Sequence, residues 1–180
     1  MLGLLLSVFL FNLIAYKTNK KLTGNQILHI WIFTIAFQQL FDLYIDIGYH
    51  AYWYFSKTEV DWESIIHILF LVPPVNIIFL NLYPMKKRIQ NKILFIFLWN
   101  FIIVGYEWLT LLPSPWGFFH YGWWKLAYSF LINPFLLFIL IKYYKLINKL
   151  EKKSFWRNYK ESASWLGCYS AFCWGFIWFG

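Results

Sequence analysis

The chain has 180 residues, of which 61% are hydrophobic, 25% aromatic and only 13% charged. Soluble domains have about 25% charged residues and do not hide this much apolar surface, so the composition excludes an ordinary water-soluble protein and favours a membrane protein. The net charge of +8 does not indicate nucleic acid, because the basic residues form short clusters between long apolar runs rather than one basic face.

Long apolar runs predict the fold class, because a membrane-spanning helix needs about 20 mostly apolar residues. In chain order the expected spans are 2–16, 26–49, 64–83, 93–112 and 124–143. The charges follow the first run instead of preceding it, which predicts an uncleaved helix rather than a secretory signal. We therefore expect an all-α, polytopic transmembrane helix bundle of five to six helices. Its divisions are a five-helix domain at 1–150, a basic cytoplasmic segment at 151–161, and a sixth transmembrane or re-entrant helix at 162–180.

The distribution of Lys and Arg predicts the orientation of this bundle. All basic residues except Lys57 and Lys125 fall in three clusters, at 17–21, 86–92 and 142–160, which lie on one side of the predicted spans. The positive-inside rule makes this side cytoplasmic and places the N-terminus outside. Besides the lipid bilayer itself, anionic lipids at the cytoplasmic face are the expected partners of these clusters.

Polar residues recur at helical spacing within the central spans. The second span has Gln38, Asp42, Asp46 and His50, each four residues apart and therefore on one face of a helix. A charge near the bilayer centre costs about 2.5–3.5 kcal/mol, so we expect these groups to face one another or water. The other spans add Asn76, Glu107, Lys125, Ser129 and Asn133.

Three functions are compatible with these polar residues. The first is an outward-facing acidic site that binds or conducts a cation or a small polar solute. The second is a structural or interaction protein, in which the same residues hold the helices together. The third is a membrane enzyme acting on lipid or isoprenoid substrates with aspartate or glutamate as acid or base. The predicted ligand-binding residues are Asp42, Asp46, Glu107, Lys125, Asn76 and Asn133.

Within the first hypothesis each residue has an expected role. The two aspartates form the acidic pair, and Glu107 and Lys125 form an ion pair or gate. Asn76 and Asn133 line kinks at Pro73-Pro74 and Pro134, where each proline frees a backbone carbonyl. No catalytic motif, cofactor or metal is predicted, although the acids together with His50 and His120 could supply metal ligands.

Aromatic and small residues allow two further predictions. Trp and Tyr crowd the outer ends of the spans, which favours an aromatic belt at the headgroups, and a stacking platform for a ligand is the alternative. In the C-terminal run, Gly167, Ala171 and Gly175 lie four residues apart. Small residues at this spacing let helices approach closely, so we expect this segment to pack against another helix, either of the same chain or of a second copy in a homo-oligomer. Cys168 and Cys173 are interpreted as ordinary apolar residues.

A string of short motifs between residues 60 and 134 provides a family resemblance. The motifs are Val60-Asp61-Trp62, Pro74-Val75-Asn76, Asn81, Pro84, Tyr106-Glu107-Trp108, Trp124-Lys125-Leu126, Tyr128-Ser129 and Pro134. Over about residues 1–150 the chain resembles an uncharacterised family of small polytopic membrane proteins of spore-forming Firmicutes of the Bacillus and Clostridium kind. The resemblance implies a helical protein of a bacterial cytoplasmic membrane and implies no activity. The C-terminal part departs from the family's pattern.

Overall fold

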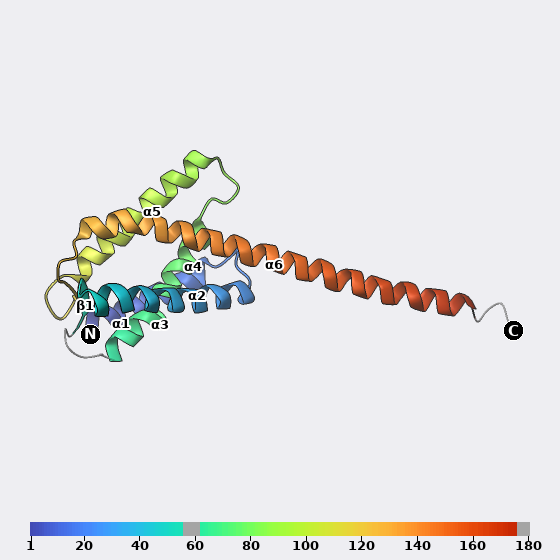
Figure 1. The fold of residues 1–180 in the computed structure, drawn as a ribbon, viewed down its shortest axis with the longest axis horizontal. Coiled ribbons are helices and arrows are strands. Elements are labelled where there is room, and N and C mark those ends of the chain that lie inside the picture. The colour runs from blue at the N-terminus through green and yellow to red at the C-terminus, as the bar shows by residue number, and fades with distance from the viewer. Residues whose placement is uncertain (56–61, 176–180) are drawn as a thin grey trace. The chain divides into compact units, whose positions relative to one another are not determined.

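The computed structural model describes the backbone of residues 1–55 and 62–175, and side chains within 1–55 and 63–155 (Figure 1). The contacts divide the chain into two compact units, Met1–Lys142 and Tyr143–Gly180. In chain order the elements are α1 (Leu2–Thr18), α2 (Gly24–Asp42), the π-helix η1 (Leu43–Gly48), β1 (Tyr52–Tyr54), α3 (Trp62–Phe70), α4 (Val72–Leu82), α5 (Ile89–Thr110), β2 (Phe119–Tyr121) and α6 (Leu126–Gly175).

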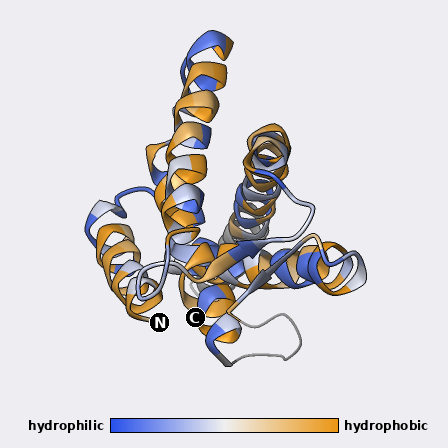
Figure 2. Cartoon of the chain, turned by 90° about the vertical axis from the view of Figure 1, so that its left-hand side faces the viewer, coloured by the Kyte–Doolittle hydropathy of each residue, from blue (hydrophilic) through white to orange (hydrophobic). Residues whose placement is uncertain are grey.

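Hydropathy confirms the predicted class of fold. In the described part of the chain, four helical stretches are long and apolar enough to cross a membrane. They are Gly24–Gly48, Glu63–Leu82, Ile89–Thr110 and Leu126–Phe155. Their large apolar side chains are widely exposed, as the hydrophobic colouring of the helices shows (Figure 2). Such faces need lipid around them, so the all-α transmembrane bundle predicted from the sequence is correct.

Helix α1 is shorter than a standard span but runs alongside α4. At its start the Gly3 amide donates to the Pro115 carbonyl over 3.3 Å. Just beyond its end the Lys20 and Lys21 amides both donate to the Asn81 side-chain oxygen of α4, each over 3.2 Å. At about 1.5 Å per residue its 17 residues span about 25 Å, close to the thickness of the hydrocarbon core.

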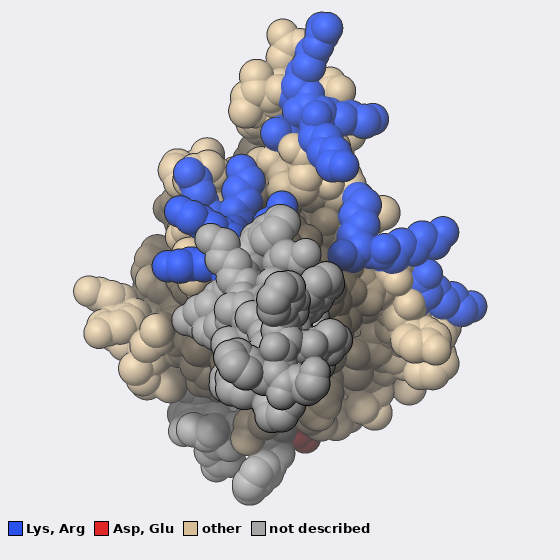
Figure 3. Space-filling model, turned by 90° about the vertical axis from the view of Figure 1, so that its right-hand side faces the viewer, with Lys and Arg blue, Asp and Glu red and all other residues tan. Residues whose placement is uncertain are grey.

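The Asn81 contact also brings two basic clusters together. It joins the loop after α1, which has Lys20 and Lys21, to the end of α4, just before Lys86–Arg88. We call this part of the first unit the basic end, comprising residues 17–21 and 86–92. Figure 3 shows many Lys and Arg side chains on the face that it draws and almost no Asp or Glu. The sequence prediction that these two clusters share a side agrees with this placement.

Two prolines remove backbone hydrogen-bond donors from the helices, and asparagines from neighbouring helices compensate for the lost hydrogen bonds. Pro74 cannot donate to the Phe70 carbonyl, at the break between α3 and α4, and Asn12 of α1 donates to that oxygen over 2.8 Å. Pro134 cannot donate to the Phe130 carbonyl, which receives the Asn100 amide of α5 over 2.9 Å. Backbone groups freed in a membrane need such partners.

This pairing corrects part of the sequence analysis. Asn76 was expected to line the kink in the third span, but it donates to Thr34 of α2 over 3.0 Å and so joins α4 to α2. The asparagines that do serve the prolines, Asn12 and Asn100, come from other helices. Sequence spacing does not predict such a partner, because it lies on another helix, 58 or 30 residues away.

The second span also differs from its expected regularity. Helix α2 begins with a capping box in which Thr23 and Gln26 bind each other's backbone amides. From Leu43 onward the chain forms the π-helix η1, whose i→i+5 hydrogen bonds change the angle between successive residues. Within the predicted stripe, the Gln38 side chain binds Asp42 directly, whereas His50 lies past η1, exposed and left-handed at φ 49°.

A two-stranded sheet covers the opposite end of the first unit, which we call the sheet end. Strands β1 and β2 are antiparallel, with Tyr52 opposite Tyr121 and Tyr54 opposite Phe119. The Ala51 carbonyl accepts the amides of Gly122 and Trp124 over 2.8 and 3.0 Å, which closes the turn into α6. Neither strand was expected. The core here consists of Leu4, Ala51, Tyr52, Tyr54, Leu71, Phe118, Phe119 and Trp124.

The aromatic residues of this end therefore divide into two groups. Tyr52, Tyr54 and Trp124 are buried in the core, so the prediction of a headgroup belt was wrong for them. The exposed rings retain that interpretation, and they are Tyr49, Trp108, Trp116 and Trp123.

Helix α6 continues from the last candidate span through the basic segment without interruption. Residues 151–161 are thus helical, and 162–175 continue the same helix instead of forming a separate one. The side chains of Gly167, Ala171 and Gly175 lie outside the described part, so the oligomer contact stays a prediction, as does the relation of this stretch to the bilayer.

Candidate functional site

Two adjoining cavities lie inside the first unit. The first has a volume of about 200 Å³ and lies beneath the sheet, bordered by α2, α5 and the start of α6. The second, of about 230 Å³, lies farther along the same helices toward the basic end. They share the lining residues Gln38, His67, Val72, Ile103, Tyr106, Asn133 and Leu136. The shared lining places the two cavities side by side, with these residues at their boundary.

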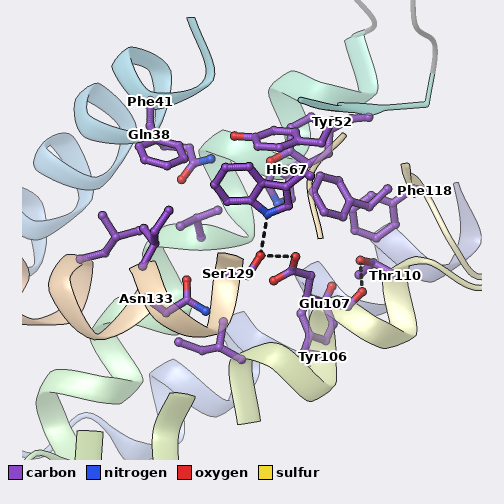
Figure 4. A pocket seen from close by; sticks show the side chains of 17 residues that line it. Gln38, Phe41, Tyr52, His67, Tyr106, Glu107, Thr110, Phe118, Ser129 and Asn133 are labelled. Carbon is purple, nitrogen blue, oxygen red and sulfur yellow. Dashed lines mark hydrogen bonds between the residues drawn. The ribbon is translucent and has the colours of Figure 1, made fainter. Parts of the chain in front are cut away.

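Glu107 is the carboxylate that lines the first cavity (Figure 4). Its Oε1 accepts the Tyr121 hydroxyl over 2.6 Å and the Ser129 hydroxyl over 2.5 Å. The Trp124 indole donates to the Ser129 oxygen over 2.8 Å. Because the indole can only donate, the Ser129 hydrogen is directed to Glu107. Three elements, β2, α5 and α6, thus fix the carboxylate.

Lys125 was the expected ionic partner of Glu107, and the structure does not form this pair. Lys125 is exposed just before α6, while Glu107 is half-buried and bound to hydroxyl groups. Among the side chains that the structure describes, no ion pair to Glu107 is present. Proximity along the chain suggested the pair, but the turn of the chain at Trp124 directs the lysine outward.

Asp42 does not line the first cavity, but it binds two residues that do. It is buried, and its Oδ1 accepts the Tyr52 hydroxyl over 2.7 Å. The Gln38 side-chain amide donates to Oδ1 and Oδ2 over 3.0 and 3.1 Å. Both partners line the first cavity, so Asp42 orients them. Asp46 lies half-buried in η1 and lines neither cavity.

The sheet tyrosines keep their protons under ordinary conditions. Burial, and then the neighbouring Asp42 carboxylate, raise the pKa of Tyr52 well above its usual value. Burial, and then the hydrogen bond to Glu107, raise the pKa of Tyr121 in the same direction. Both hydroxyls therefore remain donors throughout the physiological range.

Aromatic rings form much of the cavity wall. The Tyr54 ring lies 4.6 Å from the His67 ring, and Phe118 lies 5.9 Å from it on another side. Tyr52 contacts Trp124 edge to face at 5.7 Å. Figure 4 shows Tyr52, His67 and Phe118 around the same space as Glu107 and Ser129. The first cavity thus combines one carboxylate with several aromatic rings.

Two nitrogen atoms at the junction of the cavities have no hydrogen-bond partner among the residues that the structure describes. They are the buried Nδ1 of His67 and Nδ2 of Asn133, and both residues line both cavities. Buried polar atoms are nearly always paired, so unpaired ones in a cavity indicate a place where a water or ligand binds.

The structure thus divides the six predicted site residues. Glu107 and Asn133 line the first cavity, and Asn76 and Asn133 line the second. Asp42, Asp46 and Lys125 line neither. The residues missed were His67, Ser129, Trp124, Tyr52 and Tyr121. Ser129 had a signal, because it shares a helical face with Asn133, and the aromatic residues had one in the alternative of a stacking platform.

For the metal alternative, within residues 1–55 and 62–155 no group of three or more His, Cys, Asp or Glu side chains is placed to hold an ion. No family model, curated protein or solved structure matches the chain. The resemblance to the Firmicutes family accordingly stays a prediction.

Proposed function

We propose that this protein binds a small, positively charged solute in the first cavity. The observation that supports the proposal best is the Glu107 carboxylate, held by hydroxyl groups among aromatic rings and facing no cation within the described residues. A carboxylate at membrane depth is costly unless it is protonated or neutralised by a cation. A solute with an ammonium group supplies that charge.

The walls and the size of the cavity restrict the class of solute that fits. Aromatic faces attract cations, by about 2 kcal/mol or more when the contact excludes water, and Tyr52, Phe118 and Trp124 line this cavity. Its volume of about 200 Å³ is below the 300–1,000 Å³ typical of sites for drug-sized ligands. The unpaired nitrogens of His67 and Asn133 favour water beside the solute, since water can accept from the Asn133 amide and an ammonium group cannot.

The binding test uses tetramethylammonium as a probe and the full chain in lipid nanodiscs. Isothermal titration calorimetry should detect binding to the wild type after subtraction of empty nanodiscs. Glu107→Gln keeps the shape and removes the charge, so its affinity should fall about tenfold to a hundredfold. Glu63→Gln, on a side chain that lines neither cavity, is the matched control and should bind like wild type. Equal affinity of all three proteins would sink the proposal.

A structural or interaction role is the second candidate, and Asp42 favours it. Its oxygens are engaged by Tyr52 and Gln38, so the residue holds the sheet to α2. Under this alternative Glu107→Gln would lower the melting temperature as much as Asp42→Asn does. Under the binding proposal Asp42→Asn is the more destabilising change, and Glu107→Gln affects binding first. The enzyme alternative stays a prediction.

We further propose a placement in the membrane. The basic end faces the cytoplasm of a bacterial cell and binds anionic lipids, and the sheet end and the N-terminus face outward. With both native cysteines replaced, a cysteine introduced at the exposed Ser114 should react with an impermeant maleimide in intact cells. One introduced at Lys87 should react only after lysis. The reverse pattern would refute this orientation.

A further inference from the structure

The second cavity differs in chemistry from the first. Its wall is mainly hydrocarbon and phenyl, from Phe33, Phe37, Val75, Leu137 and Leu140. Two of its polar groups satisfy each other, since the Asn76 amide donates to the Thr34 hydroxyl over 3.0 Å. This part of the interior therefore offers contact to an apolar chain and no counter-charge to an ion.

The lining residues show the order of the two cavities along the helices. On α6 the first cavity is lined between Ser129 and Leu136 and the second between Asn133 and Leu140, a displacement of about one helical turn. On α2 the second reaches back to Phe33, away from the sheet. Along the helices, the cavity with the carboxylate and aromatic rings at the sheet end is thus followed by an apolar cavity toward the basic end.

From this arrangement we infer that the ligand is a single-chain amphiphile. Its cationic head binds at Glu107 in the first cavity, and its hydrocarbon chain occupies the second. The inference rests on the proposed function for the head group and adds the chain. The shared residues His67 and Asn133 surround the position where head and chain join, and their unpaired nitrogens suit a partly hydrated junction.

The test is a chain-length series of alkyltrimethylammonium ions from methyl to octyl, kept below micelle-forming concentrations. Titration into protein nanodiscs, corrected with empty nanodiscs, gives the affinity for each chain. Each methylene that enters the second cavity from water should tighten binding about fourfold. Val75→Trp fills that cavity and should abolish the increase while leaving the tetramethylammonium affinity unchanged. Leu131→Trp, on an exposed position of α6, is the matched control and should keep the increase.

The outcomes separate the two proposals. If tetramethylammonium binds but added methylenes do not tighten binding, or Val75→Trp keeps the full increase, the amphiphile inference falls and the proposed function stands. If the octyl compound binds equally well to wild type and Glu107→Gln, the chain alone is recognised and the cationic site falls. No binding by any member refutes both. Should Val75→Trp lower the melting temperature strongly, Leu140→Phe replaces it, since Leu140 also lines only the second cavity.

Discussion

Tyr52 and Tyr121 lie opposite each other in the two-stranded sheet, and each donates its hydroxyl to a carboxylate on a different helix. Tyr52 binds Asp42 of α2 over 2.7 Å, and Tyr121 binds Glu107 of α5 over 2.6 Å. One pair of sheet residues thus ties two helices to the cover of the first cavity. This link places the carboxylate of Glu107 and gives Asp42 its structural role.

Removal of either hydroxyl should therefore destabilise the first unit. Tyr52→Phe and Tyr121→Phe should each cost about 1–3 kcal/mol, because a hydrogen bond to a carboxylate is lost at a half-buried or buried site. Thermal unfolding in detergent followed by near-ultraviolet circular dichroism measures the change. Tyr128→Phe, on an exposed ring, is the control. If Tyr121→Phe and Tyr128→Phe had the same melting temperature, the hydrogen bond between Tyr121 and Glu107 would contribute nothing to stability.

High pH should act through the same two residues. Their pKa values are raised above the usual value near 10, so the folded state holds these protons more tightly than the unfolded chain. Their contribution is fully present below pH 10 and is lost as the pH rises beyond it. The melting temperature of the wild type should fall between pH 10 and 12, and that of the Tyr52→Phe, Tyr121→Phe double variant should fall less. Parallel curves would contradict this account.

Asn100 should be needed only because Pro134 is present. Asn100→Leu leaves the Phe130 carbonyl without its donor and should cost about 1–3 kcal/mol. Adding Pro134→Ala restores a backbone donor for the same oxygen, so the double variant should recover much of the loss. A double-mutant cycle on unfolding free energies measures this coupling. Purely additive effects would show that Asn100 acts in some other way.

Hydrogen exchange at individual amides can test the contact between the two loops of the basic end. Asn81→Ala removes the oxygen that accepts the Lys20 and Lys21 amides, so their hydrogen exchange should accelerate about tenfold. Asn91→Ala, at an exposed position in α5, should leave both rates unchanged. Unaltered exchange in Asn81→Ala would mean that the loop is held by other contacts.

At the start of α1, the backbone of Gly3 closely approaches the backbone of Trp116. A Cβ at this position would collide with the Trp116 carbonyl, and backbone atoms cannot yield as a flexible side chain does. Gly3→Ala should therefore lower the unfolding free energy by about 1–3 kcal/mol. In Gly105→Ala of α5 the new methyl meets nothing within 4 Å, and the better helix propensity should add up to about 1 kcal/mol. Equal effects of the two changes would refute the close contact.

Local hydropathy was sufficient to predict the membrane class and the approximate helices. Each span is a run of apolar residues, and the benefit of placing them in lipid accumulates residue by residue along the chain. The clustering of Lys20 and Lys21 with Lys86–Arg88 could be predicted for the same reason, since two spans lie between these loops and an even number of spans returns the chain to the same side. The polar stripe was partly right because Gln38 and Asp42 are close in sequence as well as in space.

Only the tertiary structure decided which polar groups meet. Glu107 binds Tyr121 and Ser129 instead of Lys125, and Asn12 reaches Phe70 over a separation of 58 residues. Hydrogen bonds depend on positions and directions in space, which a spacing of four along one helix does not specify. The three-residue strands around Tyr52 and Tyr121 are too short to give a periodic signal, so the sheet that completes the site emerges only when distant segments pack together.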